Sequence, residues 1–281
     1  MSPADQLGFI TVRIACKTKV GEDSVGTGFF FSFPLNEKTN IPVIITNRHV
    51  IKDSILGTFQ LTEADKDGMP KIGTFTNVKL DAFEGLWVHH PDQDVDLCAM
   101  PIAPLFNAAK GQGKSFFYRS FSKDLIAMPE TMSELSALEE IVMVGYPVGI
   151  WDSTNNMPIF RKGITATKPG LDYEGHKEFM IDAACFPGSS GSPVLLFNVG
   201  GYTTKTGDIM LGATRIKLLG VLYAGPQFTV EGRLEVVPVP TKTIPISLSQ
   251  IPINLGLVIK AERILEFEDI FLRLAQQGQG S

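Results

Sequence analysis

Short apolar runs dominate the hydrophobic pattern of the chain, and Gly, Pro, Asn and Asp separate one run from the next. Residues 10–17 alternate strictly, with one face formed by Ile10, Val12, Ile14 and Cys16. A period of two is typical of a strand that is buried on one side. Further segments that read as strands lie at residues 26–33, 42–48, 72–80, 85–90, 96–102, 140–146, 158–167, 177–184, 192–197, 216–225, 233–240 and 255–261. This succession predicts an all-β fold of antiparallel barrels or a sandwich.

Two stretches interrupt the strand pattern. Residues 105–138 contain few clean strands, and AAKGQGKS at 108–115 is typical of a flexible loop, so a connection between two halves is expected there. Residues 261–277 show the spacing of an amphipathic helix, with apolar positions at Ile264, Phe267, Phe271 and Leu274. We expect this C-terminal helix to pack on the protein's own surface.

Charge and length narrow the classes of function. The 281 residues carry a net charge of −5, which argues against a nucleic-acid partner because phosphate binding needs a basic face. The chain has no apolar run of about 18 residues and no signal-peptide pattern at its start, so no membrane association is expected.

The cysteines indicate a reducing environment. Cys16, Cys98 and Cys185 are odd in number, and their spacing matches neither a zinc site nor a disulfide framework. We therefore expect free, mostly buried thiols, a cytoplasmic location and no metal or other cofactor.

The segment FPGSSGSPVLLF (186–197) is the sharpest candidate for chemistry. A nucleophilic serine needs a tight turn that exposes its hydroxyl and directs backbone N–H groups at the developing oxyanion. Gly188 and Gly191 allow such a turn around Ser190, with the N–H groups of Gly188 and Ser190 as the oxyanion hole. Taken alone, the segment fits an ordinary Gly/Ser/Pro turn between strands equally well.

A serine hydroxyl needs a base, and the chain offers four histidines. His49 lies at the end of an apolar strand, which would fix its backbone. His89 and His90 are adjacent in a strand-to-turn segment and face opposite ways, which suits a surface or supporting role. His176 lies in a polar loop and is expected to be solvated. His49 is therefore the candidate base.

The base in turn needs a carboxylate that holds its tautomer. HPDQDVDLCAMPI (90–102) supplies Asp92, Asp94 and Asp96. Asp96 abuts the apolar strand LCAMPI, so its side chain can be partly buried, whereas Asp92 and Asp94 are typical turn residues.

These three segments, in the order His, Asp, Ser, resemble the motifs of trypsin-like serine peptidases. TNRHV (46–50) is similar to the histidine motif, with Val50 where secreted members carry a disulfide cysteine. DLCAM (96–100) resembles the aspartate motif, and GSSGSP (188–193) is similar to Gly-x-Ser-Gly-Gly-Pro with Ser192 at the second glycine. The resemblance covers roughly residues 9–260.

GTGFFF, FMIDAACFPGSSGSP and NLGLVIKA further resemble the bacterial branch that includes the HtrA peptidases. The resemblance implies a single trypsin-like domain with two antiparallel six-stranded barrels of the chymotrypsin type and the C-terminal helix. The implied divisions are barrel 1 at about 9–104, a connection at about 105–138, barrel 2 at about 139–260 and the helix at about 261–277. No region after residue 260 is long enough for a PDZ domain.

The resemblance also implies a serine endopeptidase with the triad His49, Asp96 and Ser190 and a polypeptide substrate. The substrate would pair as an extra strand near LYAGP (222–226), and the specificity pocket would be lined by Ala184, Cys185, Phe186, Tyr223, Ala224 and Gly225. Ala184 would stand where trypsin-type members hold an acidic residue, which favours an apolar side chain before the cut.

Two alternatives and one point of regulation accompany this interpretation. A catalytically silent or partner-activated domain that binds proteins stays open. An esterase of the α/β-hydrolase type does not fit, because its triad runs Ser, Asp, His and its motif ends in glycine rather than Ser192. The position of the activating aspartate of trypsin-type zymogens holds the uncharged Ser189, so we expect no activation by cleavage.

Overall fold

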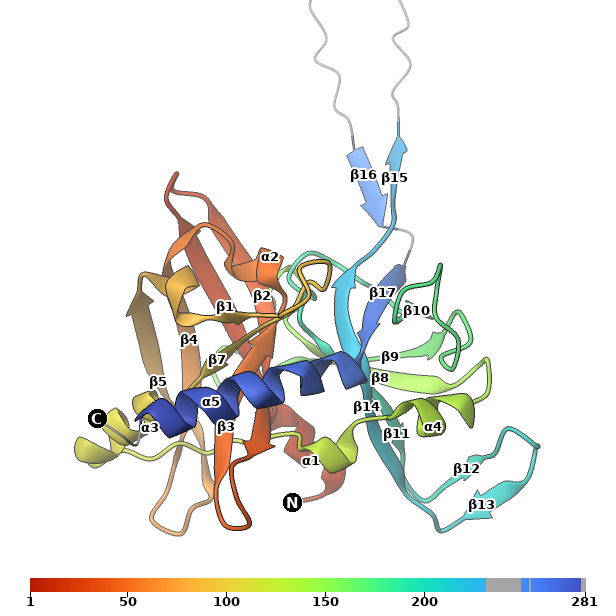
Figure 1. Ribbon diagram of the computed structural model, residues 1–281, viewed down its shortest axis with the longest axis horizontal. Coiled ribbons are helices and arrows are strands. Elements are labelled where there is room, and N and C mark those ends of the chain that lie inside the picture. The colour runs from red at the N-terminus through yellow and green to blue at the C-terminus, as the bar shows by residue number, and fades with distance from the viewer. Residues whose placement is uncertain (231–248, 253, 279–281) are drawn as a thin grey trace, which may run out of the picture.

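The structure is a computed structural model and describes residues 1–230, 249–252 and 254–278. Its N-terminal half is a seven-stranded antiparallel sheet with the strand order β5-β4-β1-β2-β3-β7-β6 (Figure 1). The strands are β1 (Thr11–Thr18), β2 (Asp23–Pro34), β3 (Asn40–Thr46), β4 (Ser54–Ala64), β5 (Pro70–Asp81), β6 (Val88–His89) and β7 (Cys98–Pro101). The predicted alternation in β1 is present, because Val12, Ile14 and Cys16 are buried in the core of this half.

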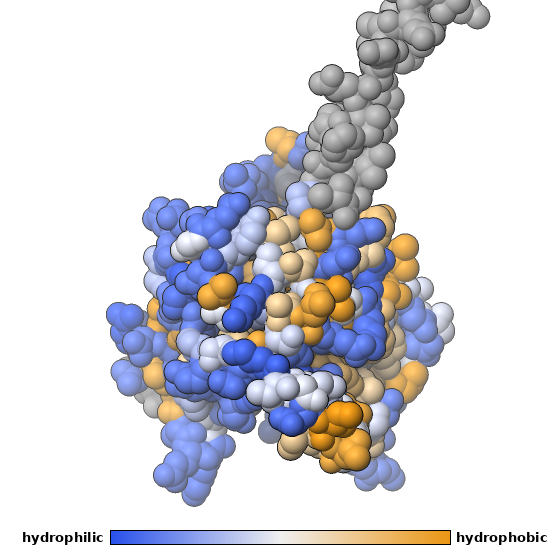
Figure 2. Space-filling view, turned by 90° about the vertical axis from the view of Figure 1, so that its right-hand side faces the viewer, coloured by the Kyte–Doolittle hydropathy of each residue, from blue (hydrophilic) through white to orange (hydrophobic). Residues whose placement is uncertain are grey.

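The C-terminal half contains a closed six-stranded barrel in the order β10-β17-β14-β11-β8-β9. Its strands are β8 (Glu140–Gly145), β9 (Ile159–Thr165), β10 (Glu178–Asp182), β11 (Pro193–Asn198), β14 (Arg215–Ala224) and β17 (Leu255–Lys260). Two hairpins extend from it (Figure 1): β12 (Gly201–Thr203) with β13 (Ile209–Leu211), and β15 (Gln227–Val230) with β16 (Ser249–Pro252). Figure 2 faces this side and shows apolar groups scattered among hydrophilic ones.

The predicted all-β class, with a six-stranded barrel and a C-terminal helix, is confirmed. The N-terminal half differs in detail from the expected six-stranded barrel. Its sheet has seven strands and ends in β5 and β6, because the two-residue strand β6 adds to β7 at the edge. The strand predicted at 233–240 lies outside the described residues.

Short helices and turns connect these strands. They are α1 (Pro3–Gln6), η1 (Leu7–Phe9), α2 (Arg48–Ile51), η2 (Phe83–Leu86), α3 (Ala103–Gly111), η3 (Lys123–Leu125), α4 (Pro129–Ser133) and η4 (Pro147–Gly149). The loop expected at 108–115 is wrong in its first part, since α3 runs through Gly111. Pro104 in the first turn and the helix-forming pair Ala108 and Ala109 explain the helix. No helix within the described ranges is long and apolar enough to cross a membrane.

The C-terminal segment consists of η5 (Ala261–Phe267) and α5 (Glu268–Gly278), and it crosses from the barrel over the N-terminal sheet (Figure 1). Ile264, Phe267 and Phe271 are buried, and the ring of Phe271 stacks on Phe33 with centroids 5.5 Å apart. Leu274, expected on the same face, is exposed. The segment therefore packs on the protein's own core, as predicted, and joins the two halves.

Candidate active site

Two neighbouring strands of the N-terminal half bring His49 and Asp96 together. His49 lies in α2 directly after β3, and Asp96 lies two residues before β7 begins. Because Thr46 and Cys98 are paired across β3 and β7, the two side chains emerge side by side. His49 Nδ1 is 2.5 Å from Asp96 Oδ2, and the His49 backbone N–H donates to Oδ1 at 3.0 Å. Asn47 Nδ2 donates to the Asp96 carbonyl at 2.8 Å, which fixes the backbone of the carboxylate as well.

This pair is partly open to solvent. The side chain of His49 is 46% exposed and that of Asp96 is 19% exposed. An outer cavity of about 520 Å³ reaches both of them, and its other lining residues are Arg48, Lys52, Glu84 and His89. The Asp96 carboxylate is thus partly open to water and is bonded to both the backbone N–H and the ring of His49, as an orienting group for an imidazole requires.

The turn around Ser190 depends on two glycines with positive φ. Gly188 has φ 88° and Gly191 has φ 85°, values that residues other than glycine rarely adopt. A Cβ on Gly188 would stand 2.5 Å from the Tyr146 carbonyl oxygen, and a Cβ on Gly191 would stand 2.5 Å from Thr46 Oγ1. Both positions therefore lack room as well as conformational freedom for a side chain.

Four successive carbonyl groups of this turn accept hydrogen bonds within the protein. Pro187 O accepts from Val148 N–H at 2.6 Å, and Ser189 O accepts from Ser192 N–H at 3.0 Å. The two intervening carbonyls, of Gly188 and Ser190, both accept from Thr27 at 2.9 and 2.8 Å.

The N–H groups of the same turn alternate between bonded and free. Ser189 N–H donates to Phe186 O and Gly191 N–H donates to Leu222 O, whereas the N–H groups of Gly188 and Ser190 have no acceptor among the described residues. In a trans peptide the N–H points opposite to the carbonyl of the same unit. Because the carbonyls of Pro187 and Ser189 are held by hydrogen bonds, the N–H groups of Gly188 and Ser190 point in the opposite direction to these carbonyls. Two free N–H donors side by side are what an oxyanion hole requires.

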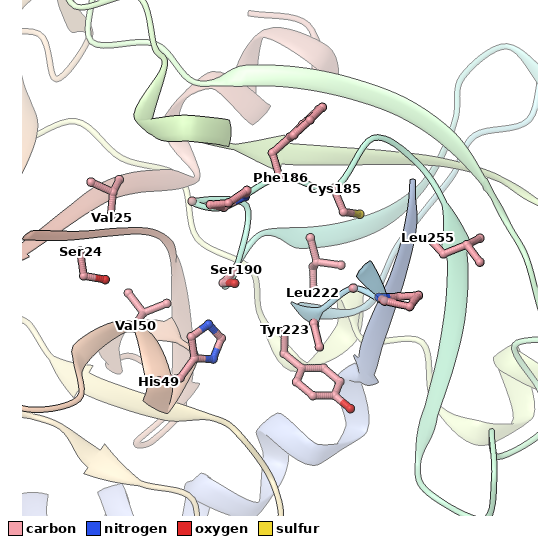
Figure 3. Close-up of a pocket in the computed structure, with 15 residues that line it drawn as sticks. Ser24, Val25, His49, Val50, Cys185, Phe186, Ser190, Leu222, Tyr223 and Leu255 are labelled. Atoms are coloured by element: carbon pink, nitrogen blue, oxygen red, sulfur yellow. The ribbon is translucent and has the colours of Figure 1, made fainter. Parts of the chain in front are cut away.

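Ser190 and His49 line one cavity of about 410 Å³ between the two halves. Figure 3 shows Ser190 between His49 and the segment of Cys185 and Phe186. Within the described part of the chain, Ser190 Oγ makes no hydrogen bond to the His49 ring, whose bonded partner is Asp96. Asp96 itself does not line this cavity and approaches His49 from the outer side.

Most of the residues predicted for the specificity pocket line this cavity. They are Cys185, Phe186, Tyr223, Ala224 and Gly225. Ala184 does not line it, because its carbonyl is turned to Arg161, which donates at 2.6 Å. The cavity is also lined by Leu222 and Leu255, which the sequence interpretation did not assign to the pocket. Leu222 is the first residue of the segment 222–226 that was expected to pair with the substrate, but nothing in the sequence indicates that Leu255, the first residue of β17, reaches the cavity.

Two titratable groups on the specificity side of the cavity, Cys185 and Tyr223, have a raised pKa. Burial raises the pKa of the Cys185 thiol to about 11. Burial, reinforced by a 2.9 Å hydrogen bond to Glu178, raises the pKa of the Tyr223 hydroxyl. None of the described residues that line the cavity carries a carboxylate. A cationic substrate side chain would therefore find no ionic partner on this wall.

Of the other candidate histidines and aspartates, His89 is exposed and lines the outer cavity beside His49 and Asp96, whereas the others lie elsewhere. His90 is buried, with its ring nitrogens 3.2 Å from Asp92 O and 3.1 Å from Arg263 O, so it braces the C-terminal segment. Asp92 accepts from Arg263 at 2.7 Å. Asp94 lies in the turn that Asp92 caps. His176 is exposed.

The three cysteines lie in the described part of the chain and are free. Within the residues that the structure describes, no three His, Cys, Asp or Glu side chains gather in a way that could hold a metal ion.

Several solved structures have a loosely similar backbone course. The active form of the Rv3671c protease from M. tuberculosis is 14% identical, with 94% of this chain and 84% of that chain covered and a TM-score of 0.44. The structure of GrC is 10% identical, with 98% and 97% covered and a TM-score of 0.49. The HL collagenase is 11% identical, with 98% and 94% covered and a TM-score of 0.44. No curated protein matches the chain.

The sequence itself is more decisive than these distant structures. The family model of the trypsin-like peptidase domain matches residues 26–200, which is more than half of the chain and includes His49, Asp96 and Ser190. The chain therefore belongs to the family of trypsin-like peptidase domains.

Proposed function

We propose that this protein is a serine endopeptidase that cleaves polypeptides through an acyl-enzyme on Ser190. One observation carries the proposal: Ser190 and His49 line the same cavity, and the N–H groups of Gly188 and Ser190 have no acceptor within the described chain. A turn that leaves two donors free beside a serine and a carboxylate-bound imidazole has the parts that acyl transfer needs.

Four residues have defined roles in the proposed reaction: His49, Asp96, Ser190 and Gly188. His49 Nδ1 donates to Asp96, so Nε2 is left to accept the proton of Ser190. Ser190 Oγ then attacks the scissile carbonyl, whose oxygen becomes an oxyanion held by the N–H groups of Gly188 and Ser190. His49 returns the proton to the leaving amine, and water hydrolyses the acyl-enzyme by the same route.

The cavity wall supports a preference for apolar residues before the cut. Cys185, Leu222 and Leu255 contribute apolar surface to it. The segment at 222–226 continues β14 to the edge of the cavity, where a substrate backbone can add as a strand. We assign the substrate-binding role to this segment and to the residues around it.

Three broader assignments belong to the same proposal. The chain is interpreted as one domain, with the strands of the second half beginning at Glu140. The motifs GTGFFF and NLGLVIKA favour the bacterial HtrA-like branch. Three free cysteines favour a reducing, cytoplasmic compartment.

A silent or partner-activated domain is the second candidate, and one observation favours it. Ser190 Oγ lacks a hydrogen bond to His49 among the described residues, although such bonds are often long before substrate binds. Labelling of the purified protein with a serine-directed fluorophosphonate separates the two candidates. We expect label on Ser190 of the intact chain, as read by intact mass and peptide mapping. If only a clipped form of the chain takes the label, the expectation that the protein needs no proteolytic activation is contradicted. Absence of label would favour the silent domain.

A further inference from the structure

A single buried threonine of the N-terminal half bonds to the turn that carries Ser190. Thr27 lies in β2 and its side chain is completely buried. Its hydroxyl donates to the Gly188 carbonyl at 2.9 Å and accepts from the Tyr146 N–H at 3.1 Å. Its backbone N–H donates to the Ser190 carbonyl at 2.8 Å. Thr27 therefore holds the peptide units 188–189 and 190–191. The N–H groups of the proposed oxyanion hole belong to the units directly before each of these, 187–188 and 189–190.

The hydroxyl of Thr27 has its hydrogen-bonding capacity filled. A hydroxyl offers one donor and two acceptor lone pairs. The donor goes to Gly188, and the lone pairs face the Tyr146 N–H and Ser192 Oγ, which lies 3.3 Å away. A buried network that is fully satisfied in this way specifies one arrangement of its members.

Ser192 explains the departure from the family's double glycine. Its side chain is buried and its hydroxyl donates to Thr27 Oγ1. Gly145 supplies the space, since a Cβ there would lie 2.7 Å from Thr27 Oγ1 and would overlap Ser192 Oγ. The extra serine is thus part of the Thr27 network and does not crowd the turn.

The network extends to the peptide that precedes Gly188. The N–H of Tyr146 donates to the Thr27 hydroxyl, and Tyr146 directly precedes η4. Within η4, Val148 donates its N–H to Pro187 O at 2.6 Å. Val148 has φ 52°, a strained value for a β-branched residue, so the surrounding contacts must enforce it. Arg13 adds one such contact by donating to the Gly149 carbonyl at 3.1 Å.

We propose that Thr27 is the positioning residue that orders the oxyanion hole in this protein, and this rests on the proposed peptidase function. Trypsin-type zymogens order the hole with an ion pair at the position of Ser189. Here Ser189 is buried and uncharged, and its hydroxyl only accepts the Phe186 N–H at 3.4 Å. The hydroxyl of Thr27 holds the adjacent peptide by a neutral hydrogen bond, so the hole needs no new N-terminus.

The test compares Thr27→Val with a matched control, Thr165→Val. Thr165 is also fully buried, donates to a carbonyl (Ala137 O, 2.7 Å) and accepts a backbone N–H (Glu139, 2.9 Å), but it does not line the cavity. Each substitution removes the same kind of hydroxyl and keeps the side-chain shape. Thermal unfolding measures the common loss of stability.

The reactive probe is a fluorophosphonate in excess. In its reaction the Ser190 Oγ–P bond forms, the P–F bond breaks, fluoride leaves and the serine proton passes to His49. Thr27→Val should lower the maximal labelling rate about 10- to 100-fold, somewhat less than loss of an oxyanion-hole donor itself. The half-saturating probe concentration should stay within about twofold, because binding does not use the hole before bond formation. Thr27→Ser should restore the rate, and Thr165→Val should leave it unchanged.

Hydrogen exchange of the peptide that contains residues 186–192 gives a readout that needs no activity. Thr27→Val should speed exchange there, and Thr165→Val should not. An unchanged labelling rate and unchanged exchange in Thr27→Val would overturn the positioning role, as would an equal loss of rate in Thr165→Val. A wild-type protein that takes no label refutes the proposed function, and exchange alone then decides the role of Thr27. If Thr27→Val does not fold, Thr27→Ala against Thr27→Ser makes the same comparison.

Discussion

The two halves of the molecule hold their proposed catalytic groups in different ways. His49 and Asp96 are fixed within the N-terminal half, by the adjacency of β3 and β7 and by the hydrogen bonds between the two residues. The turn of Ser190 is fixed partly from outside its own half, because Thr27 of β2 bonds to two of its carbonyls. The base therefore depends on strand pairing within one half, whereas the nucleophile depends also on the contact between the halves.

The largest expected effect is loss of the nucleophile or the base. Ser190→Ala and His49→Ala should each lower turnover by roughly 10⁴-fold or more, by analogy with other triads. Folding should survive, since both side chains line a cavity. Steady-state kinetics and thermal unfolding measure the two quantities. Abolition of labelling by Ser189→Ala or Ser192→Ala, with Ser190→Ala still reactive, would show that the nucleophile is assigned to the wrong serine.

The next effect tests the tight fit of the Ser190 turn. Gly188→Ala should lower the labelling rate by about 10²- to 10³-fold, because the new Cβ would press on the Tyr146 carbonyl and displace a donor of the oxyanion hole. Gly207→Ala is the control, since Gly207 has a similar φ of 93° and nothing within 4 Å of the added Cβ. Gly207 lies between β12 and β13, outside the cavity, so a similar loss in both variants would mean that general destabilisation, and not close approach at the Ser190 turn, lowers the labelling rate.

We expect the cavity wall contributed by the second half to set the preference for the residue before the cut. Peptides with Val, Ala, Leu or Met at this position should exceed those with Lys or Arg by about 100-fold in kcat/KM, because a buried cation would lack a partner beside Cys185, Leu222 and Leu255. A proteome-derived peptide library measures this ratio. Dominant cleavage after basic residues would contradict the assignment of these lining residues.

The smallest effect compares one thiol from each half. Burial raises the pKa of both Cys16 and Cys185 to about 11, so at neutral pH both are protonated and unreactive. As the pH rises toward this value the thiolate fraction grows, and alkylation of Cys185 by iodoacetamide should accelerate because this residue lines the cavity. Cys16, which is 3% exposed, should stay unmodified in the folded protein. Peptide mapping follows both thiols, and rapid alkylation of Cys185 at pH 7 would contradict the expected pH dependence.

The sequence predicts those parts of the fold that depend on local periodicity. The alternation of residues 10–17 predicts β1, and the spacing of Ile264, Phe267 and Phe271 predicts the buried face of the C-terminal segment. β4 (Ser54–Ala64) was missed although its burial alternates along much of its length, because Gly57 and several half-buried polar residues weaken the apolar signal.

The site shows the same limit. Local motifs point to His49, Asp96 and Ser190 as the candidate triad, since each lies at the edge of a recognisable strand or turn. The part played by Leu255 and by Thr27 depends on contacts between distant segments, such as the 161-residue separation of Thr27 and Gly188. No periodicity or motif spacing records such a contact, so only the folded chain reveals it.

The long-range bond of Thr27 has a consequence for the newly made polypeptide. During synthesis the strands of the N-terminal half are made before residues 186–192. The Ser190 turn cannot reach its bonded form until it meets β2, so a nascent or half-folded chain has a serine whose surrounding peptides are not yet held in place. In the proposed peptidase, this contact would couple formation of the oxyanion hole to the meeting of the two halves, so that a chain whose halves have not yet met would lack an ordered hole.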